Sequence, residues 1–225
     1  MLKNDLNRTV EDYLRAIYRV EERDGKVSNA ALASELGISG AAVTEMMRKL
    51  AYAGMLRYKK YQGAKLTAEG RAAAVETTRR HRLWETFLIE HLNFEWDQVH
   101  ELAHQLEHIN SPELIDRLDD FLGNPTHDPH GDPIPARDGT ISERDLVPIS
   151  GMEPEESGIV ARVSDEYPEL LRYAASLGLS IKTRITVLER IGFDGSVRLT
   201  AGGRESVISA KLAESVFVEK SRVEE

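Results

Sequence analysis

The chain of 225 residues is long enough for roughly two or three small domains, and it contains no cysteine, which excludes disulfides and thiolate metal sites. Its net charge of −9 is unevenly spread: residues 1–80 hold 15 basic and 10 acidic side chains, and the remainder holds 14 and 28. The basic first part is therefore compatible with nucleic acid, and the acidic remainder with cations. Neither a signal peptide nor a membrane-spanning run is visible, which predicts a soluble cytoplasmic protein without a membrane partner.

The first 53 residues predict a helix-turn-helix. Apolar residues recur at helical spacing over residues 9–23, which predicts the first helix. Ser28 is placed to cap a second helix and Ser39 a third, and Gly37 separates the two. Two helices joined by a glycine-containing turn within about 23 residues are typical of DNA-binding proteins.

A basic hairpin follows directly, with short strands predicted over residues 54–58 and 64–67. The sequence thus predicts a winged helix-turn-helix over residues 1–75. Small or hydrogen-bonding side chains begin the second helix of the motif, where they allow contact with phosphates or base edges, and lysines and arginines of the wing suit phosphates. The predicted DNA-contacting residues are Ser39, Ala41, Ala42, Thr44, Glu45, Arg48, Lys49, Arg57, Lys59, Lys60 and Lys65.

Three further helices are predicted over residues 67–91, 97–110 and 112–122. Their apolar side chains exceed what one small domain needs to bury. Residues 76–140 are therefore interpreted as a helical domain that also forms a homodimer interface.

Residues 100–108 read His-Glu-Leu-Ala-His-Gln-Leu-Glu-His, and their first five residues match the H-E-x-x-H pattern of zinc peptidases. At about 100° per residue, four ligand-type side chains share one helix side, opposite the apolar stripe. These four are His100, His104, Glu107 and His108. A zinc metallopeptidase using His100-Glu101-x-x-His104 would need a distant third ligand, because Glu107 stands where the extended pattern requires glycine. A cation site, a peptidase and a solvated polar face thus remain hypotheses.

The last third of the chain changes character. Residues 123–156 are rich in Gly, Pro and Asp and lack apolar periodicity, so residues 141–156 are predicted to be a linker. Short β-type runs then recur through residues 157–225, with one helix over residues 168–177. This pattern predicts a small β-barrel.

Several segments, in this order and spacing, make the chain resemble the diphtheria-toxin-repressor-like family of iron- and manganese-dependent transcriptional regulators. The segments are Val-Glu-Asp-Tyr-Leu (10–14), the winged motif, His81-Arg-Leu-Trp-Glu85, residues 100–108 and His130-Gly-Asp-Pro-Ile-Pro135. The resemblance implies a mainly α fold with small β parts: a winged helix-turn-helix, a helical dimerisation domain and an SH3-like barrel. It also implies a DNA-binding regulator, not an enzyme, that represses metal-uptake genes when metal-loaded.

The resemblance further implies two metal sites per subunit. The primary site would use Asp12, His104, Glu107 and His108. The ancillary site would use His81, Glu85 and His100, completed by Glu166 or Asp165 from the barrel. The family's other barrel ligand matches Val163, whose side chain cannot bind metal.

The resemblance also indicates which metal the primary site would bind. Asp12 stands where iron-responsive relatives place methionine, and His104 where relatives carry Cys or Glu. Such a sulfur-free site favours Mn(II), with Fe(II) as second candidate. The expected partners are double-stranded operator DNA and a second copy of the chain, with no small-molecule substrate. A metal-independent DNA-binding protein, in which the histidines are structural, remains an alternative.

Overall fold

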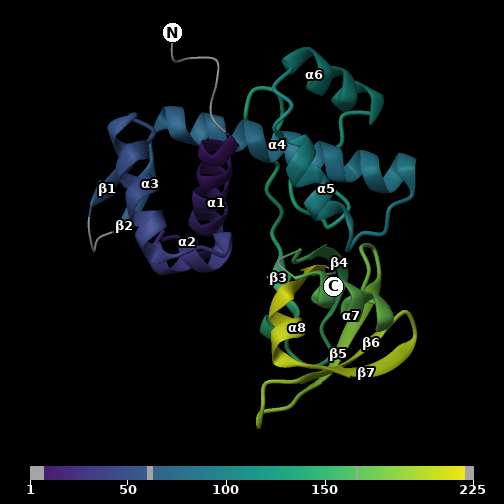
Figure 1. Ribbon diagram of the computed structural model, residues 1–225. Helices are drawn as coiled ribbons and strands as arrows, with labels where there is room; N and C mark the ends of the chain where they lie inside the picture. The colour runs from purple at the N-terminus through teal and green to yellow at the C-terminus, as the bar shows by residue number, and fades with distance from the viewer. Residues whose placement is uncertain (1–7, 60–62, 166, 221–225) are drawn as a thin grey trace. The chain divides into compact units, whose positions relative to one another are not determined.

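The computed structural model describes residues 8–59, 63–165 and 167–220, which form two compact units (Figure 1). The first unit comprises Met1–His81, Gln105–Ile115 and Pro135–Thr140, and the second comprises Arg82–His104, Asp116–Ile134 and Ile141–Glu225. The division passes through three helices, at residues 81/82, 104/105 and 115/116. Among the described residues, no helix combines the length and the apolar character needed to cross a membrane.

The predicted helix-turn-helix is present in the first unit. Its helices are α1 (Arg8–Asp24), α2 (Asn29–Leu36) and α3 (Gly40–Tyr52). Ser28 and Ser39 cap α2 and α3 by accepting hydrogen bonds from backbone N–H groups of the first turn, as predicted. Apolar side chains from all three helices are almost fully buried together, and they include Leu14, Ile17, Leu32, Met47 and Leu50.

The predicted wing is an antiparallel hairpin of β1 (Leu56–Lys59) and β2 (Gly63–Leu66). After it, the Thr67 hydroxyl accepts from the Gly70 N–H at 3.1 Å and so begins α4 (Ala68–Leu92). Gly70 permits this packing, because an added Cβ would lie 2.0 Å from the Met55 carbonyl oxygen. The start of α4 is thereby fixed to the chain that enters the wing.

Two shorter helices follow, α5 (Val99–Leu106) and α6 (Pro112–Phe121). The prediction of one helix over residues 97–110 was wrong at both ends. The Ile109 N–H reaches back only three residues, to the Leu106 carbonyl at 3.0 Å, so the chain leaves the α-helical pattern there. Glu107 and His108 consequently lie in a turn after α5.

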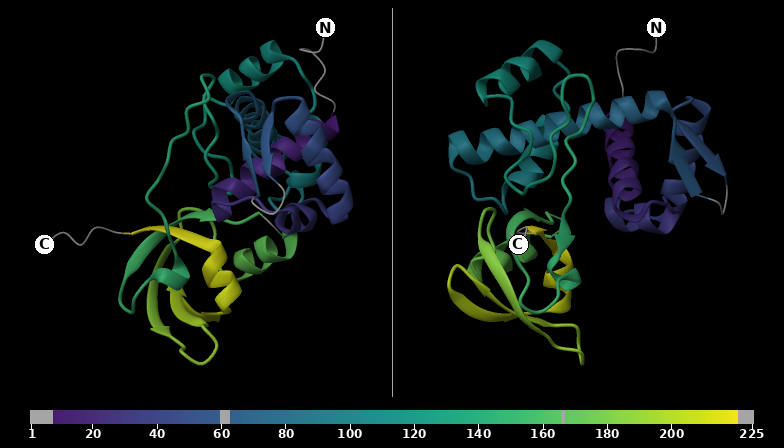
Figure 2. Two further views of the ribbon diagram at one scale, coloured as in Figure 1. Left: turned by 90° about the vertical axis from the view of Figure 1, so that its left-hand side faces the viewer. Right: turned by 180° about the vertical axis from the view of Figure 1, so that it is seen from behind.

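The second unit contains a six-stranded antiparallel sheet in the order β3-β8-β4-β5-β6-β7, which encloses one apolar core (Figure 2). Register shifts in β4 and β5 bend the strands, as expected for a small SH3-like barrel. The strands are β3 (Val147–Pro148), β4 (Ser157–Val163), β5 (Arg184–Arg190), β6 (Val197–Ala201), β7 (Arg204–Ile208) and β8 (Val216–Lys220), with the helices α7 (Pro168–Ser176) and α8 (Ala210–Ser215) and the 3-10 turn Ile149–Gly151.

The linker predicted over residues 141–156 needs correction, because β3 pairs with β8 and therefore belongs to the sheet. Helix α8 was not predicted either, since its six residues are too few to show helical periodicity. The segment before the linker is also ordered: His127 pairs with Pro133, and the Asp128 carboxylate accepts from the His130 and Asp132 N–H groups at 2.9 Å. These contacts hold residues 127–133 in a defined turn.

Candidate metal centre

Three predicted primary ligands converge in the first unit. Nε2 of His108 lies 3.0 Å from Oδ1 of Asp12 and 3.8 Å from Oε1 of Glu107. Asp12 comes from α1, whereas Glu107 and His108 come from the turn after α5, and Glu107 is fully buried. Ligand atoms around one octahedral cation at ~2.1 Å lie ~3 Å apart, so this spacing fits a shared ion. The donor set of carboxylate oxygen and imidazole nitrogen suits a divalent cation.

His104, the fourth predicted primary ligand, lies on α5 four residues before His108 and is half-buried. It belongs to the second unit, so its part in the primary site stays a prediction.

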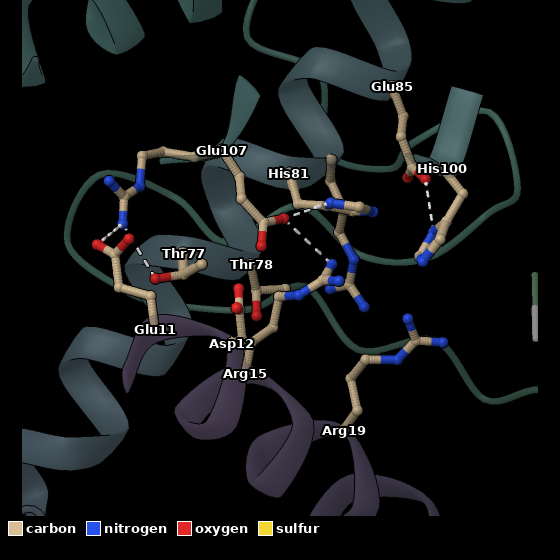
Figure 3. A network of polar contacts seen from close by, with 12 residues as sticks. Glu11, Asp12, Arg15, Arg19, Thr77, Thr78, His81, Glu85, His100 and Glu107 are labelled. Carbon is tan, nitrogen blue, oxygen red and sulfur yellow. Dashed lines mark hydrogen bonds and ion pairs between the residues drawn. The ribbon is translucent and has the colours of Figure 1, made fainter. Parts of the chain in front are cut away.

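Basic side chains of the first unit surround the buried carboxylate of Glu107. Nδ1 of His81 lies 2.5 Å from Oε2 of Glu107, and Nη1 of Arg15 lies 3.4 Å from the same oxygen (Figure 3). A buried carboxylate needs such partners, because its charge is costly to desolvate. His81 was predicted as an ancillary ligand, and within the first unit its ring also contacts Glu107, a predicted primary ligand. The contact between His81 and Glu107 could not be predicted from the sequence, because the spacing of residues along α4 does not determine which residues of other segments they contact.

A second cluster lies wholly within the second unit. Nδ1 of His100 is 3.3 Å from Oε1 of Glu85 and 3.5 Å from Oδ2 of Asp165. Burial alone would lower the pKa of His100, but hydrogen bonding and attraction to Asp165 and Glu85 raise that pKa to about 9. The structure thus joins two predicted ancillary ligands to one of the two barrel candidates. The other candidate, Glu166, lies outside the described residues.

His130 and Asp128 extend this cluster, and the sequence had not identified either as a ligand. Nδ1 of His130 is 3.8 Å from Oε2 of Glu85, and ligand atoms of Glu85, Asp128 and His130 lie within 4.8 Å of one another. His130 is fully buried; burial would lower its pKa, but the carboxylates of Glu85 and Asp128 raise it to about 10. The pattern Asp128-Pro-His130-Gly-Asp132 was the available signal, because it places three ligand-type residues within one turn.

The predicted DNA-contacting side chains are exposed, except for Thr44, which is half-buried. The Thr44 hydroxyl donates to the Gly40 carbonyl and accepts from Asn29, both at 2.8 Å, so it ties α3 to α2. Glu45 pairs with Lys49 at 2.7 Å on the exposed side of α3. Lys60 lies outside the described residues.

Glu101, the base that a peptidase would require, is exposed on α5. It belongs to none of the potential metal groups found among the described residues.

Family models match most of the chain in three consecutive segments. Residues 5–64 match the iron dependent repressor N-terminal DNA binding domain, and residues 67–136 match the iron dependent repressor metal binding and dimerisation domain. Residues 147–220 match the FeoA domain.

Whole-chain relatives agree with these matches. The iron-dependent repressor IdeR of Mycobacterium leprae (strain TN) is 32% identical over 96% of this chain and 99% of its own. A solved manganese-dependent transcriptional repressor complex with manganese has a TM-score of 0.89 and 38% identity, covering 94% of this chain and 100% of that one. The manganese regulator SloR has a TM-score of 0.81 and 34% identity, covering 94% and 98%.

Proposed function

Because the chain belongs to the iron dependent repressor family of metal-dependent, DNA-binding transcriptional repressors, we propose that it is activated by Mn(II), with Fe(II) as second candidate. The family consists of DNA-binding regulators, not enzymes. The observation that carries the proposal is the convergence of Asp12, Glu107 and His108 from two separate segments of the first unit.

The donor chemistry supports the choice of metal. Asp12 supplies a hard carboxylate oxygen, and the chain has no cysteine to offer a soft ligand. A solved manganese-dependent repressor at 38% identity supports the same choice, whereas the curated relatives at 31–32% identity carry iron in their names. The intrinsic affinity order favours zinc over manganese at such sites, so selectivity has to come from geometry and metal supply.

We propose two sites per subunit. The primary site comprises Asp12, His104, Glu107 and His108, as the resemblance implied. For the second site we propose Glu85, His100, Asp165 and His130, because their ring nitrogens and carboxylates lie together in the second unit. His81 stays a predicted ancillary ligand, and we propose that it also supports Glu107, because the two side chains lie 2.5 Å apart.

The primary site would link DNA binding to metal through α1. Asp12 lies on α1, which packs against α2, and α2 in turn packs against α3; Glu107 and His108 follow α5. A bound cation supplies positive charge that offsets the repulsion between Asp12 and Glu107. The metal then favours the arrangement of α1 that brings these ligands together. The size of this effect is set by how much more tightly the metal binds this arrangement than any other.

The protein is expected to act as a homodimer on operator DNA, in keeping with its matches to DNA-binding and dimerisation domains. The side chain of Phe121 is 63% exposed, and its ring lies 6.1 Å from Phe87 and 4.7 Å from His91. An exposed aromatic cluster of this kind suits a subunit interface. On the DNA side, Ala41, Ala42, Arg48 and Lys49 of α3 and Arg57, Lys59 and Lys65 of the wing are the proposed contacts.

The proposal is tested by DNA binding across a panel of metals. A binding site is first selected from random DNA in Mn(II), and its affinity is then measured at fixed salt with Mn(II), Fe(II), Zn(II) or a chelator. We expect tight binding with Mn(II), weaker binding with Fe(II), and at least about 10-fold weaker binding with chelator. Equal affinity in all four conditions would identify a metal-independent DNA-binding protein.

A further inference from the structure

We propose that Glu11, a residue outside the predicted ligand sets, positions His108 for metal binding and selects the ring nitrogen that faces the ion. The inference deepens the proposed function and rests on its primary site. It follows from a chain of contacts, Thr77–Arg80–Glu11–His108, that lies entirely within the first unit.

The two nitrogens of His108 face different carboxylates. Nδ1 lies 2.7 Å from Oε2 of Glu11, while Nε2 lies 3.0 Å from Oδ1 of Asp12. Glu11 can only accept when ionised, so this contact requires a proton on Nδ1. In the neutral ring the lone pair then resides on Nε2, which faces Asp12 and Glu107.

Glu11 is held rigidly from its other side. Its Oε1 accepts from Nη2 of Arg80 at 2.8 Å, and the same nitrogen lies 3.0 Å from the Thr77 hydroxyl. The Glu11 and Arg80 side chains are only 5% and 4% exposed. A carboxylate in such a buried pair cannot turn away without leaving a charge uncompensated, so its Oε2 remains directed at His108.

The position of Glu11 in the sequence adds to this argument. Glu11 precedes Asp12 on α1, so one turn of one helix supplies both a predicted ligand and the group that orients a second ligand. Hydrogen bonding of a ligating imidazole to a carboxylate fixes its tautomer and raises its basicity, and loss of such a partner typically costs about 10- to 100-fold in metal affinity.

Glu21 provides a matched control. It lies on the same helix and also pairs with an arginine of α4, Arg71, at 3.0 Å. The Arg71 side chain is 46% exposed. Removing the Glu21 charge therefore perturbs an α1–α4 ion pair of the same type without touching His108.

The first experiment compares Mn(II) affinities of Glu11→Gln, Glu21→Gln and the wild type, measured by electron paramagnetic resonance on the full chain. We expect Glu11→Gln to weaken binding at one site by about 10- to 100-fold, whereas Glu21→Gln stays within about twofold. Equal affinities for the two variants would overturn the proposal.

The second experiment examines the wild type directly, so it does not depend on whether a variant folds. In protein with ¹⁵N-labelled histidine loaded with ¹¹³Cd(II), one-bond coupling marks the metal-bound nitrogen. We expect coupling to Nε2 of His108 and a proton on its Nδ1. Coupling to Nδ1 would overturn the role of Glu11 while leaving the metal site intact, and no coupling to His108 would overturn the primary site as well.

Discussion

Replacing Asp12 by alanine is expected to abolish the effect of Mn(II) on DNA binding. Asp12 is the only α1 member of the primary ligand set, and its Oδ1 lies 3.0 Å from Nε2 of His108. Without its carboxylate, a cation held by Glu107 and His108 would no longer engage α1. Removing a group that only hydrogen-bonds to a metal ligand typically lowers metal affinity by about 10- to 100-fold. Because Asp12 is itself a proposed ligand, we expect the affinity for Mn(II) at this site to fall by at least about 100-fold.

Asp24→Ala is the control for this experiment. Asp24 is an exposed aspartate at the other end of α1, and its carboxylate pairs with the neighbouring Arg23 at 3.0 Å. This variant should retain the Mn(II) dependence of the wild type. An Asp12→Ala protein that still required Mn(II) for tight DNA binding would show that α1 is not linked to the metal.

Replacing Gly131 by alanine should disrupt the second cluster. Gly131 has φ of +90°, and an added Cβ would lie 1.9 Å from the Ala161 carbonyl oxygen on β4. Strain at positive φ and overpacking each cost about 1–3 kcal/mol, so we expect unfolding of this unit to become easier by about 3 kcal/mol or more. Because His130 is the preceding residue, bound Mn(II) should fall from two ions to one per subunit.

Gly123→Ala separates the two causes. Gly123 also has a positive φ, +77°, but nothing lies within 4 Å of its added Cβ. The Gly123→Ala variant should therefore lose only about 1–2 kcal/mol of its free energy of unfolding and still bind two Mn(II) ions per subunit. Calorimetric unfolding and metal stoichiometry measure both quantities. Equal behaviour of the two variants would mean that the contact with β4 does not hold His130 in place.

Local sequence signals predicted much of the first unit. Ser28 and Ser39 were each expected to cap a helix, and both accept the expected backbone hydrogen bond. Caps are readable because the donor and acceptor are only three residues apart. The β-type runs also located the five longer barrel strands, since alternating burial leaves a pattern of period two.

Contacts between distant segments were not predictable in the same way. The turn that carries His130 is fixed by docking: the Val163 N–H donates to the His130 carbonyl at 2.9 Å, and Gly131 packs on β4. The composition around His130, rich in Gly, Pro and Asp, gave no sign of this docking. His81 similarly contacts Glu107, which is 26 residues away along the chain, and the spacing of residues along α4 gave no sign of this contact.

The central claim is that metal binding and DNA binding favour the same arrangement of the protein, and thermodynamic linkage tests it most directly. The affinity for Mn(II) is measured on the wild type with and without saturating selected DNA, beside the affinity for DNA with and without Mn(II). The factor by which DNA raises the affinity for Mn(II) must equal the factor by which Mn(II) raises the affinity for DNA, and we expect both factors to be about 10-fold or larger. An affinity for Mn(II) that is the same with and without DNA would contradict the account.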